Sequence, residues 1–318
     1  MLLIISNSTD ATADYLCGRL IESGVPFRRF DSDTDMTRVR IAYDRGEATL
    51  KYDGDVWPAT QFSHVWYRRP EPLNLALEME AAERAQTLSE WSEALEGFLG
   101  HIPMTAWMNH PALNVCASHK MEQLSRAVRF GLNVPRTLIS QDPDRVCRFW
   151  EECDGRVVVK PLGDGYLERA KRSQDTHLYA NRVTPAHLER ISLVANCPAL
   201  FQQEQDKAFD VRICVVDDTV IAAGLRADDG EGRQRLDIRR NNMDDVRYHP
   251  IEIDSGMRDA ILRLVRSYGL RFSAIDMAVT AAGEWVFFEV NPNGQWAWLD
   301  LAGGFDIAQA FIMSFSRP

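Results

Sequence analysis

The chain lacks the features that mark several large classes of protein. No apolar run in its 318 residues approaches the roughly 20 residues that span a bilayer. The segment Leu2–Ile5 is too short for a signal peptide and has no basic flank. The six cysteines include no Cys-x-x-Cys pair, which argues against a zinc site and favours reduced cysteines in the core. The net charge of -10 argues against general nucleic-acid binding. We therefore expect a cytoplasmic protein that binds neither membranes nor nucleic acids.

Three common catalytic and nucleotide-binding signatures are also absent. The sequence contains no Gly-x-Ser-x-Gly, so no serine-hydrolase turn is indicated. It contains neither a Walker A motif nor Gly-x-Gly-x-x-Gly. Any nucleotide must therefore be held without either of these phosphate-binding loops.

What the sequence does contain is a strand pair with potential metal ligands, between Ala274 and Trp298. If its turn is centred on Ala282-Gly283, Asp276 lies directly opposite Glu289, and Asn291 shares the face of Glu289. Two carboxylates facing each other repel unless a cation lies between them. A set of oxygen ligands suits Mg²⁺. The alternative is a solvent-facing edge hairpin with ordinary surface acids.

The order of predicted strands and helices indicates an α/β protein of two or three lobes. The chain opens with a βα unit, a strand at 2–5 and a helix capped by Thr9 or Asp10 that ends at Gly24. Further helices are predicted at 79–100, 118–130, 254–268 and 305–315, with helix starts at Asp142-Pro143 and Thr184-Pro185. Further strands are predicted at 25–30, 65–67, 156–161, 200–204, 209–216, 219–226, 272–280 and 285–291, with a hairpin turn at Asp53-Gly54. In helix 118–130, Met121, Leu124 and Val128 form the predicted apolar face.

Lys160 ends a run of three valines, where an ammonium group is costly to desolvate unless an anion meets it. The next residues, Pro161-Leu-Gly-Asp-Gly165, form a flexible loop whose N–H groups could approach phosphate oxygens. A lysine that simply emerges at a strand end is an equally simple explanation. Lys120, on helix 118–130, reads by itself as a surface residue.

Two further groups of charged residues are candidates for chemistry. Asp210 and Arg212 share one strand face, and a buried arginine there needs a carboxylate or phosphate partner. A structural Asp-Arg pair is the alternative. Arginines also crowd the interval 226–247 together with acidic residues. That interval is either a site for an acidic substrate or a solvated hairpin of mixed charge.

In this order, the pieces resemble an ATP-grasp enzyme. Three details resemble the graspetide synthetases, microviridin-type ligases that crosslink ribosomally made peptides. These details are Trp66-Tyr-Arg-Arg-Pro70, Asp237-x-Arg239 and the ending Asn291-Pro-Asn-Gly-Gln-Trp-Ala-Trp298. One departure is Ile238, at a position where the family pattern leads us to expect an aromatic residue. The resemblance covers nearly the whole chain.

The resemblance implies a role for each candidate residue. Catalysis would involve Arg212, Arg239 and Asp237, and Mg²⁺ would be held by Asp276, Glu289 and Asn291. ATP would be bound by Lys120, Lys160, Gly163, Gly165, Gln203, Glu204, Gln205 and Asp210. In this scheme the lysines contact the phosphates, residues 203–205 line the adenine pocket, and Arg212 stabilises the transferring phosphate.

The resemblance also implies an ATP-grasp fold with a Rossmann-like N-terminal lobe. We expect a pre-ATP-grasp lobe at 1–108, a central lid subdomain at 109–205, and a C-terminal subdomain with the magnesium site at 206–318. The implied partner is a precursor peptide with a helical leader and an acidic core, docked near the Arg-rich 226–247 segment. The oligomeric state is left open, a homodimer included.

The implied reaction activates Asp or Glu side chains of the peptide as acyl phosphates and forms intramolecular ester or amide crosslinks. Two other hypotheses remain. One is an ATP-grasp ligase that joins free amino acids or adds them to a peptide, which would have no use for a leader groove. The other is a non-catalytic nucleotide- or peptide-binding module, which would have no reason to keep both lysines and the acidic set.

Overall fold

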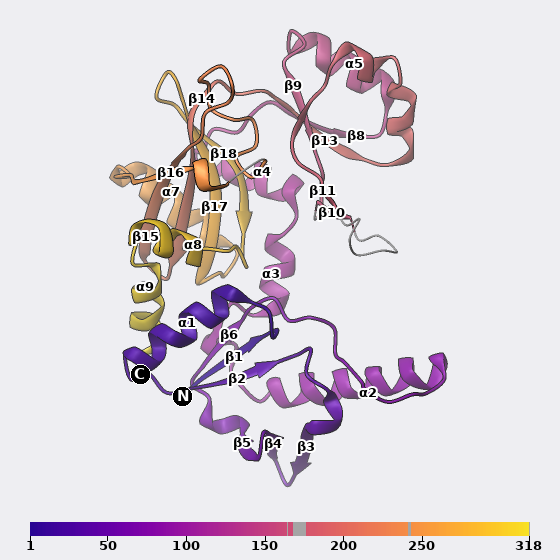
Figure 1. The fold of residues 1–318 in the computed structure, drawn as a ribbon, viewed down its shortest axis with the longest axis vertical. Helices are drawn as coiled ribbons and strands as arrows, with labels where there is room; N and C mark the ends of the chain where they lie inside the picture. Colours follow the sequence, from indigo (N-terminus) through magenta and orange to yellow (C-terminus); the bar gives the residue numbers. More distant parts are fainter. Residues whose placement is uncertain (164, 168–175, 241–242, 318) are drawn as a thin grey trace.

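The computed structural model describes residues 1–163, 165–167, 176–240 and 243–317. It contains three groups of strands and helices, arranged as a lower lobe, an upper sheet and a smaller upper lobe (Figure 1). Each group has its own sheet and its own buried apolar side chains.

The N-terminal lobe is built on a parallel sheet of order β2-β1-β6-β7. Its elements are β1 (Leu2–Ser6), α1 (Ala11–Glu22), β2 (Phe27–Asp31), β3 (Arg40–Asp44), β4 (Glu47–Tyr52), β5 (Asp55–Pro58), β6 (His64–Tyr67), α2 (Ala81–Leu99) and β7 (Trp107–Met108), with 3-10 turns at Met36–Arg38, Ala59–Gln61 and Met104–Ala106. As predicted, α1 begins after Asp10, whose carboxylate accepts the N–H groups of Thr12 and Ala13. Gly24, at φ 68°, follows the helix, a conformation that glycine adopts without strain.

The central group contains an antiparallel sheet of order β12-β9-β13-β8 and a small hairpin, β10-β11. Its elements are β8 (Thr137–Ser140), α5 (Pro143–Glu152), β9 (Val157–Lys160), β10 (Tyr166–Leu167), β11 (Thr176–His177), β12 (Asn181–Arg182), α6 (Pro185–Leu188), a 3-10 helix at Ile191–Asn196, and β13 (Ala199–Gln203). Both predicted helix starts are confirmed, since Pro143 and Pro185 are the first residues of α5 and α6.

The C-terminal sheet has the order β16-β15-β14-β17-β18. Its elements are β14 (Lys207–Val216), β15 (Thr219–Arg226), a 3-10 turn at Met243–Asp245, β16 (Arg247–Pro250), α7 (Ser255–Ser267), β17 (Phe272–Thr280), β18 (Trp285–Asn291), α8 (Ala297–Gly303) and α9 (Ile307–Phe315), and α3 (Pro111–Ala117) and α4 (Lys120–Arg129) join it from earlier in the chain. One face packs against α4 and α7. The opposite face packs against α8, α9 and α1 of the N-terminal lobe. The sheet and the first lobe therefore share one apolar core.

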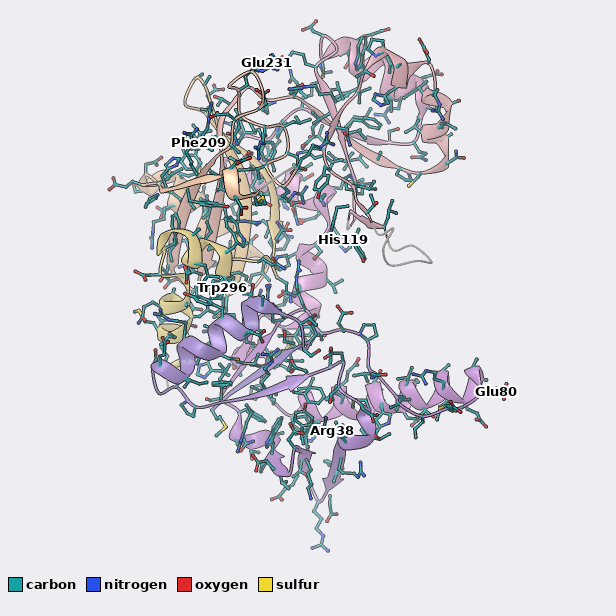
Figure 2. The ribbon with its side chains drawn as sticks, in the orientation of Figure 1. Arg38, Glu80, His119, Phe209, Glu231 and Trp296 are labelled. Atoms are coloured by element: carbon teal, nitrogen blue, oxygen red, sulfur yellow. The ribbon has the colours of Figure 1, made fainter. Side chains whose placement is uncertain are left out.

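Trp296 lies in that shared core, between the C-terminal sheet and α1 (Figure 2). Its ring stacks on Phe311 at a centroid distance of 4.9 Å and meets the edge of Tyr15 at 6.0 Å. Aromatic pairs of this kind contribute beyond the area they bury. Trp296, one of the two tryptophans in the ending noted in the sequence, therefore helps to join the C-terminal sheet to the N-terminal lobe.

The predicted apolar face of α4 is confirmed for Leu124, which is buried, and is wrong for Met121 and Val128. Met121 and Val128 are 62% and 54% exposed. The buried residues of the helix are Gln123, Leu124 and Ala127, because this side lies against β18 and the core beneath it.

The predicted domain boundaries at 109 and 206 stay predictions. The packing of α4 shows that residues after 109 contribute to the core of the C-terminal sheet.

All six cysteines are free thiols. The prediction that they are core residues holds for Cys153 and Cys214, which are buried, but is wrong for Cys116 and Cys197, which are exposed. Among the described residues, none of the helices combines the length and apolarity needed to cross a membrane.

Candidate active site

The strand pair β17-β18 places the predicted metal ligands, and a β-bulge decides its register. On the turn side of the bulge, the last pair is Met277 with Phe287, whereas the next pair on the other side is Asp276 with Glu289. Phe288 is therefore the extra residue of a bulge. The turn is one residue longer than predicted, since the N–H of Thr280 donates to the carbonyl of Glu284. The bulge offsets this difference, so the predicted opposition of Asp276 and Glu289 is confirmed.

Asp276, Glu289 and Asn291 converge as the sequence predicted. The Asn291 Nδ2 lies 3.0 Å from an Asp276 oxygen and 3.2 Å from a Glu289 oxygen. Two cations complete the cluster. The Lys120 Nζ is 3.2 Å from Glu289, and an Arg212 Nη is 3.0 Å from Asp276.

The two carboxylates titrate differently because their neighbours differ. Burial raises the pKa of Asp276, with the negative charge of Glu289 acting in the same direction and Arg212 opposing it. Burial would also raise the pKa of Glu289, but Lys120 and the Asn291 amide outweigh it and hold this pKa below its ordinary value. Ionising both carboxylates at once is unfavourable because their charges repel. A divalent cation between them would offset that repulsion.

This set of side chains fits Mg²⁺. Two carboxylates and an amide supply hard oxygen atoms, and Mg²⁺ completes its octahedron with water and phosphate oxygens. The Asn291 amide presents its nitrogen to the carboxylates, and a half-turn of the amide would present its oxygen instead. Which atom faces them depends on the hydrogen-bonding partners present.

Lys160 ends β9 beside the same cluster. Its Nζ donates to the Gln202 Oε1 at 3.0 Å and lies 4.4 Å from the centre of the Phe288 ring. Burial lowers the pKa of Lys160 to about 8, although the charge of Glu289 opposes the shift. Lys120 also donates to the carbonyl of Leu162 at 3.1 Å. Both predicted phosphate lysines thus adjoin the predicted glycine loop, Lys160 as the residue before it and Lys120 through this hydrogen bond.

The two glycines of that loop differ in whether a side chain would fit at their position. At Gly165 a Cβ would lie 2.7 Å from the carbonyl oxygen of Leu178, the residue that follows β11, and this carbonyl leaves room only for glycine. At Gly163 a Cβ would meet nothing within 4 Å. Asp164, between them, lies outside the described residues.

The predicted adenine residues lie at the end of β13, where Gln203 is the last residue, and in the connection that follows it. The Gln203 side chain is exposed, and the backbone N–H of this residue donates to the carbonyl of Arg136 at 2.9 Å. Glu204 forms a two-pronged ion pair with Arg182, and Gln205 donates to the Gln203 carbonyl at 3.0 Å. Their contact with adenine stays a prediction.

Sequence reasoning missed Gln202, which is 2% exposed. Its Oε1 accepts from Lys160 and its Nε2 donates to the Thr137 Oγ1 at 3.1 Å. The sequence carried little signal for it, since Gln202 directly precedes the predicted residues 203–205 but belongs to no motif.

Asp210 and Arg212 do not pair with each other, so the structural Asp-Arg pair is wrong as an alternative. Lys207 donates to both Asp210 oxygens at 2.8 and 2.9 Å, and Gln234 donates to one of them at 2.7 Å. Arg212 faces Asp276 across the β14-β17 ladder. Arg212 therefore belongs to the cluster of Asp276, Glu289 and Asn291, whereas Asp210 anchors the segment that carries Gln234.

Asp237 and Arg239 form a bidentate ion pair with distances of 2.9 and 2.8 Å. Asp237 is buried and also accepts the N–H of Ala180 at 3.1 Å. Burial would raise the pKa of Asp237, but Arg239 outweighs it and lowers the pKa. Ile238, between the two, packs into the core under the C-terminal sheet. The apolar side chain fixes the loop while the guanidinium of Arg239, with its side chain 64% exposed, stays accessible.

The interval 226–247 holds six arginines and six acidic residues, so it carries no net charge. Arg233 pairs with Asp229 and Glu231, and Arg247 pairs with Asp228. Residues 241–242 of this interval lie outside the described residues.

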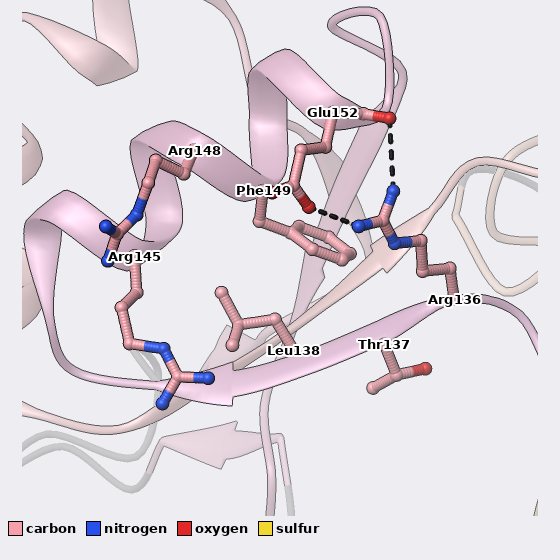
Figure 3. A pocket seen from close by; sticks show the side chains of 7 residues that line it. All are labelled: Arg136, Thr137, Leu138, Arg145, Arg148, Phe149 and Glu152. Atoms are coloured by element: carbon pink, nitrogen blue, oxygen red, sulfur yellow. Dashed lines mark hydrogen bonds and ion pairs between the residues drawn. The ribbon is translucent and has the colours of Figure 1, made fainter.

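A depression of about 450 Å³ lies elsewhere, between α5 and β8 (Figure 3). It is lined by Arg136, Thr137, Leu138, Arg145, Arg148, Phe149 and Glu152. Arg136 reaches across to Glu152 and its guanidinium lies over Phe149. The predicted site residues are not among those that line this depression.

Comparisons with known proteins cover the whole chain. Residues 1–114 match the MvdD pre-ATP grasp domain, and residues 117–315 match the RimK-like ATP-grasp domain. The crystal structure of macrocyclase MdnC bound with precursor peptide MdnA from Microcystis aeruginosa MRC superposes with a TM-score of 0.83, at 26% identity, covering 100% of this chain and 99% of that one. These matches confirm the fold class that the sequence predicted.

Two more distant similarities are informative. The ATP-grasp ligase PsnB, complexed with minimal precursor, Mg and ADP, has a TM-score of 0.75 at 22% identity, covering 99% of this chain and 96% of that one. A probable alpha-L-glutamate ligase from Shewanella loihica is 24% identical over 202 residues, 63% of this chain and 64% of that protein. The chain thus spans slightly less than two thirds of the length of the curated relatives it matches.

Proposed function

Because the chain belongs to the RimK-like ATP-grasp family, we propose that it is an ATP-dependent ligase that crosslinks a ribosomally made precursor peptide. It activates Asp or Glu side chains of that peptide and closes intramolecular ester or amide bonds. One observation carries the proposal. The chain aligns over its full length, N-terminal lobe included, with a macrocyclase that is bound to its precursor peptide.

In the first step, a peptide carboxylate attacks the γ-phosphorus of ATP, the bond to the β-phosphate oxygen breaks, and ADP leaves. Lys120 and Lys160 bind the phosphates, and Arg212 offsets the charge that develops on the transferring group. Asp276, Glu289 and Asn291 would hold Mg²⁺, which supplies further charge neutralisation at these oxygens. The distances support this assignment. The Asn291 amide lies within 3.2 Å of both carboxylates, Lys120 lies 3.2 Å from Glu289, and Arg212 lies 3.0 Å from Asp276.

In the second step, a Ser or Thr hydroxyl or a Lys amine of the same peptide attacks the acyl carbon. Phosphate leaves, and the nucleophile loses its proton. Arg239 lies near the acyl phosphate and Asp237 holds its guanidinium in place. Water would hydrolyse the acyl phosphate, so the central lobe closes over the site as a lid.

Residues 203–205 line the adenine pocket, and the loop through Gly163 and Gly165 covers the phosphates. The precursor docks near the 226–247 segment, where Arg240 reaches the central lobe through a 2.6 Å bond to Asn181. Because the segment is charge-balanced, its contribution comes from single exposed arginines.

A ligase that adds free amino acids is the second candidate, favoured by the similarity to a probable alpha-L-glutamate ligase. The two functions differ in product mass. The purified protein is incubated with ATP, Mg²⁺ and a Thr-, Ser- or Lys-containing acidic peptide encoded beside its gene. A macrocyclase gives a product lighter by one water for each ring, whereas an amino-acid ligase gives a heavier product. A heavier product, or none with any neighbouring peptide, contradicts the proposal.

A further inference from the structure

Val290 lies between two of the proposed metal ligands, on a strand that has a neighbour on one side only. β18 is the edge of the five-stranded sheet. The outward-facing N–H and C=O of an edge strand ordinarily bond to water or to another chain. Here the Val290 N–H donates to the Gln123 Oε1 at 2.9 Å, and the Gln123 Nε2 donates to the Val290 carbonyl at 2.8 Å. One side-chain amide thus takes the place of a neighbouring strand.

Gln123 is itself fixed in position. Only 1% of it is exposed, and its Nε2 donates a further bond to the carbonyl of Ala117 at 2.6 Å. The helix that carries it, α4, packs directly on the core beneath the sheet (Figure 1). One turn earlier, Lys120 contacts the Glu289 carboxylate. The helix therefore holds the strand by the backbone of Val290 and by the side chain of the residue before it.

We propose that Gln123 is a positioning residue for the metal-binding side chains. The inference rests on the proposed function. The backbone at Val290 fixes the Cα atoms of Glu289 and Asn291, and ligand geometry must hold to within about 0.5 Å. Without the amide, two backbone groups at a residue that is 2% exposed lose their partners, and the strand shifts or admits water to satisfy them.

The segment that follows the strand is held by other residues. The Arg68 Nη1 donates to the carbonyls of Asn293 and Gly294 at 2.7 and 2.9 Å, and the Asn109 Nδ2 donates to the carbonyl of Pro292 at 3.1 Å. These bonds anchor the chain beyond Asn291 independently of α4. Loss of the Gln123 bonds should therefore displace residues 289–291 without releasing the loop.

The test is a Mn²⁺ titration by electron paramagnetic resonance, with a non-hydrolysable ATP analogue present. Gln123→Met keeps the length of the side chain and removes its hydrogen bonds. We expect Mn²⁺ affinity to fall by about 10- to 100-fold, the usual effect of removing a group that orients a ligand. The matched control is Leu124→Ala, the next residue of the same helix, which is buried in the same core. It should lower Tm and leave the Mn²⁺ affinity unchanged.

Wild-type affinity in Gln123→Met, or an equal loss in Leu124→Ala, overturns the inference. Glu289→Gln in the same titration tests the metal site itself. If Glu289→Gln binds Mn²⁺ like wild type, the proposed metal site is wrong, whereas an effect confined to Glu289→Gln refutes only the role of Gln123. Should Gln123→Met not fold, hydrogen exchange at the Val290 amide of the wild-type protein decides. Exchange as slow as in β17 supports the positioning role of Gln123, and exchange as fast as in an open edge strand refutes it.

Discussion

The ammonium group of Lys160 lies 4.4 Å from the centre of the Phe288 ring. Phe288 is the bulged residue of β18, so the irregularity that sets the register of Glu289 also supplies a ring to Lys160. A cation over an aromatic face is stabilised without a counter-ion. The arrangement leaves the ammonium charge available for a phosphate, while burial lowers its pKa to about 8.

Glu289→Gln should reduce product formation by about 100-fold or more, the scale seen when a group that offsets transition-state charge is removed. The fold should persist with an unchanged or slightly lower Tm, because the substitution relieves the repulsion between two facing carboxylates but also removes the ion pair between Glu289 and Lys120. Turnover measured over a Mg²⁺ series checks this. Glu284→Gln, at the exposed turn of the same strand pair, is the control. Wild-type turnover of Glu289→Gln at low Mg²⁺ would contradict the metal assignment.

Lys160→Ala should weaken ATP binding by about ten- to hundredfold, since a hydrogen bond from a charged group to phosphate is worth about 1.5–3 kcal/mol. Peptide binding should change much less. Calorimetry with each ligand separately measures both effects. Lys51→Ala removes an exposed lysine of the N-terminal lobe and should behave like wild type. If wild type, Lys160→Ala and Lys51→Ala bind ATP equally well, Lys160 does not bind phosphate and its role is structural.

ATP affinity should also depend on pH through Lys160. Its pKa is lowered from the ordinary 10.5 to about 8, so the charged form that phosphate requires is lost as pH rises through about 8. The dissociation constant for ATP should be flat below that pH and rise by up to about tenfold per unit above it. Lys160→Ala should abolish this dependence. The same shift makes the contribution of Lys160 to stability rise between about pH 8 and 10.5, because the unfolded chain retains the proton longer.

The sequence predicted most elements of the fold because their signals are local. Asp10, Pro143 and Pro185 mark helix starts through their own backbone preferences. The site was predicted less directly. Asp276 was placed opposite Glu289 with a turn that was one residue too short, and a bulge that no local pattern indicates made up the difference.

The residues that sequence reasoning missed act through tertiary contacts. Gln123 and Gln202 are neutral amides without a motif, and their roles depend on Val290 and Lys160, which lie far away in the chain. In α4, the spacing of Met121 and Val128 matched a buried helix face as well as the spacing of the residues that are in fact buried. Only packing against β18 determines which face is buried.

Arg240→Glu should raise KM for the precursor by about twofold to fivefold, the range for an exposed charge interaction, and make it less sensitive to salt. KM for ATP should stay unchanged. Arg240 is chosen because Arg235 is largely buried and paired with Asp245, so reversing Arg235 would disturb the loop. The control is Arg263→Glu, the same charge reversal at an exposed arginine of α7, outside the 226–247 segment. If the two variants act alike, the peptide does not dock near Arg240.

Arg239→Ala should lower kcat by about 100-fold while KM for the precursor stays near the wild-type value, the mark of an interaction made mainly in the transition state. The residue is suited to this role because its guanidinium is exposed while Asp237, buried beneath it, fixes its orientation through two bonds.

Removing Arg239 also leaves the Asp237 carboxylate buried without its ion pair, which costs stability, so a fall in activity alone is ambiguous. Asp237→Asn separates the two effects, because it removes the buried charge and keeps an oxygen that can accept the Ala180 N–H. It should be less destabilised than Arg239→Ala, because no buried charge is left unpaired, and it should lose part of kcat as Arg239 becomes mobile. Arg239→Lys keeps the charge but cannot form the two-pronged pair and should fall between wild type and Arg239→Ala. If Arg239→Ala instead raises KM at constant kcat, Arg239 binds the peptide and does not act at the acyl phosphate.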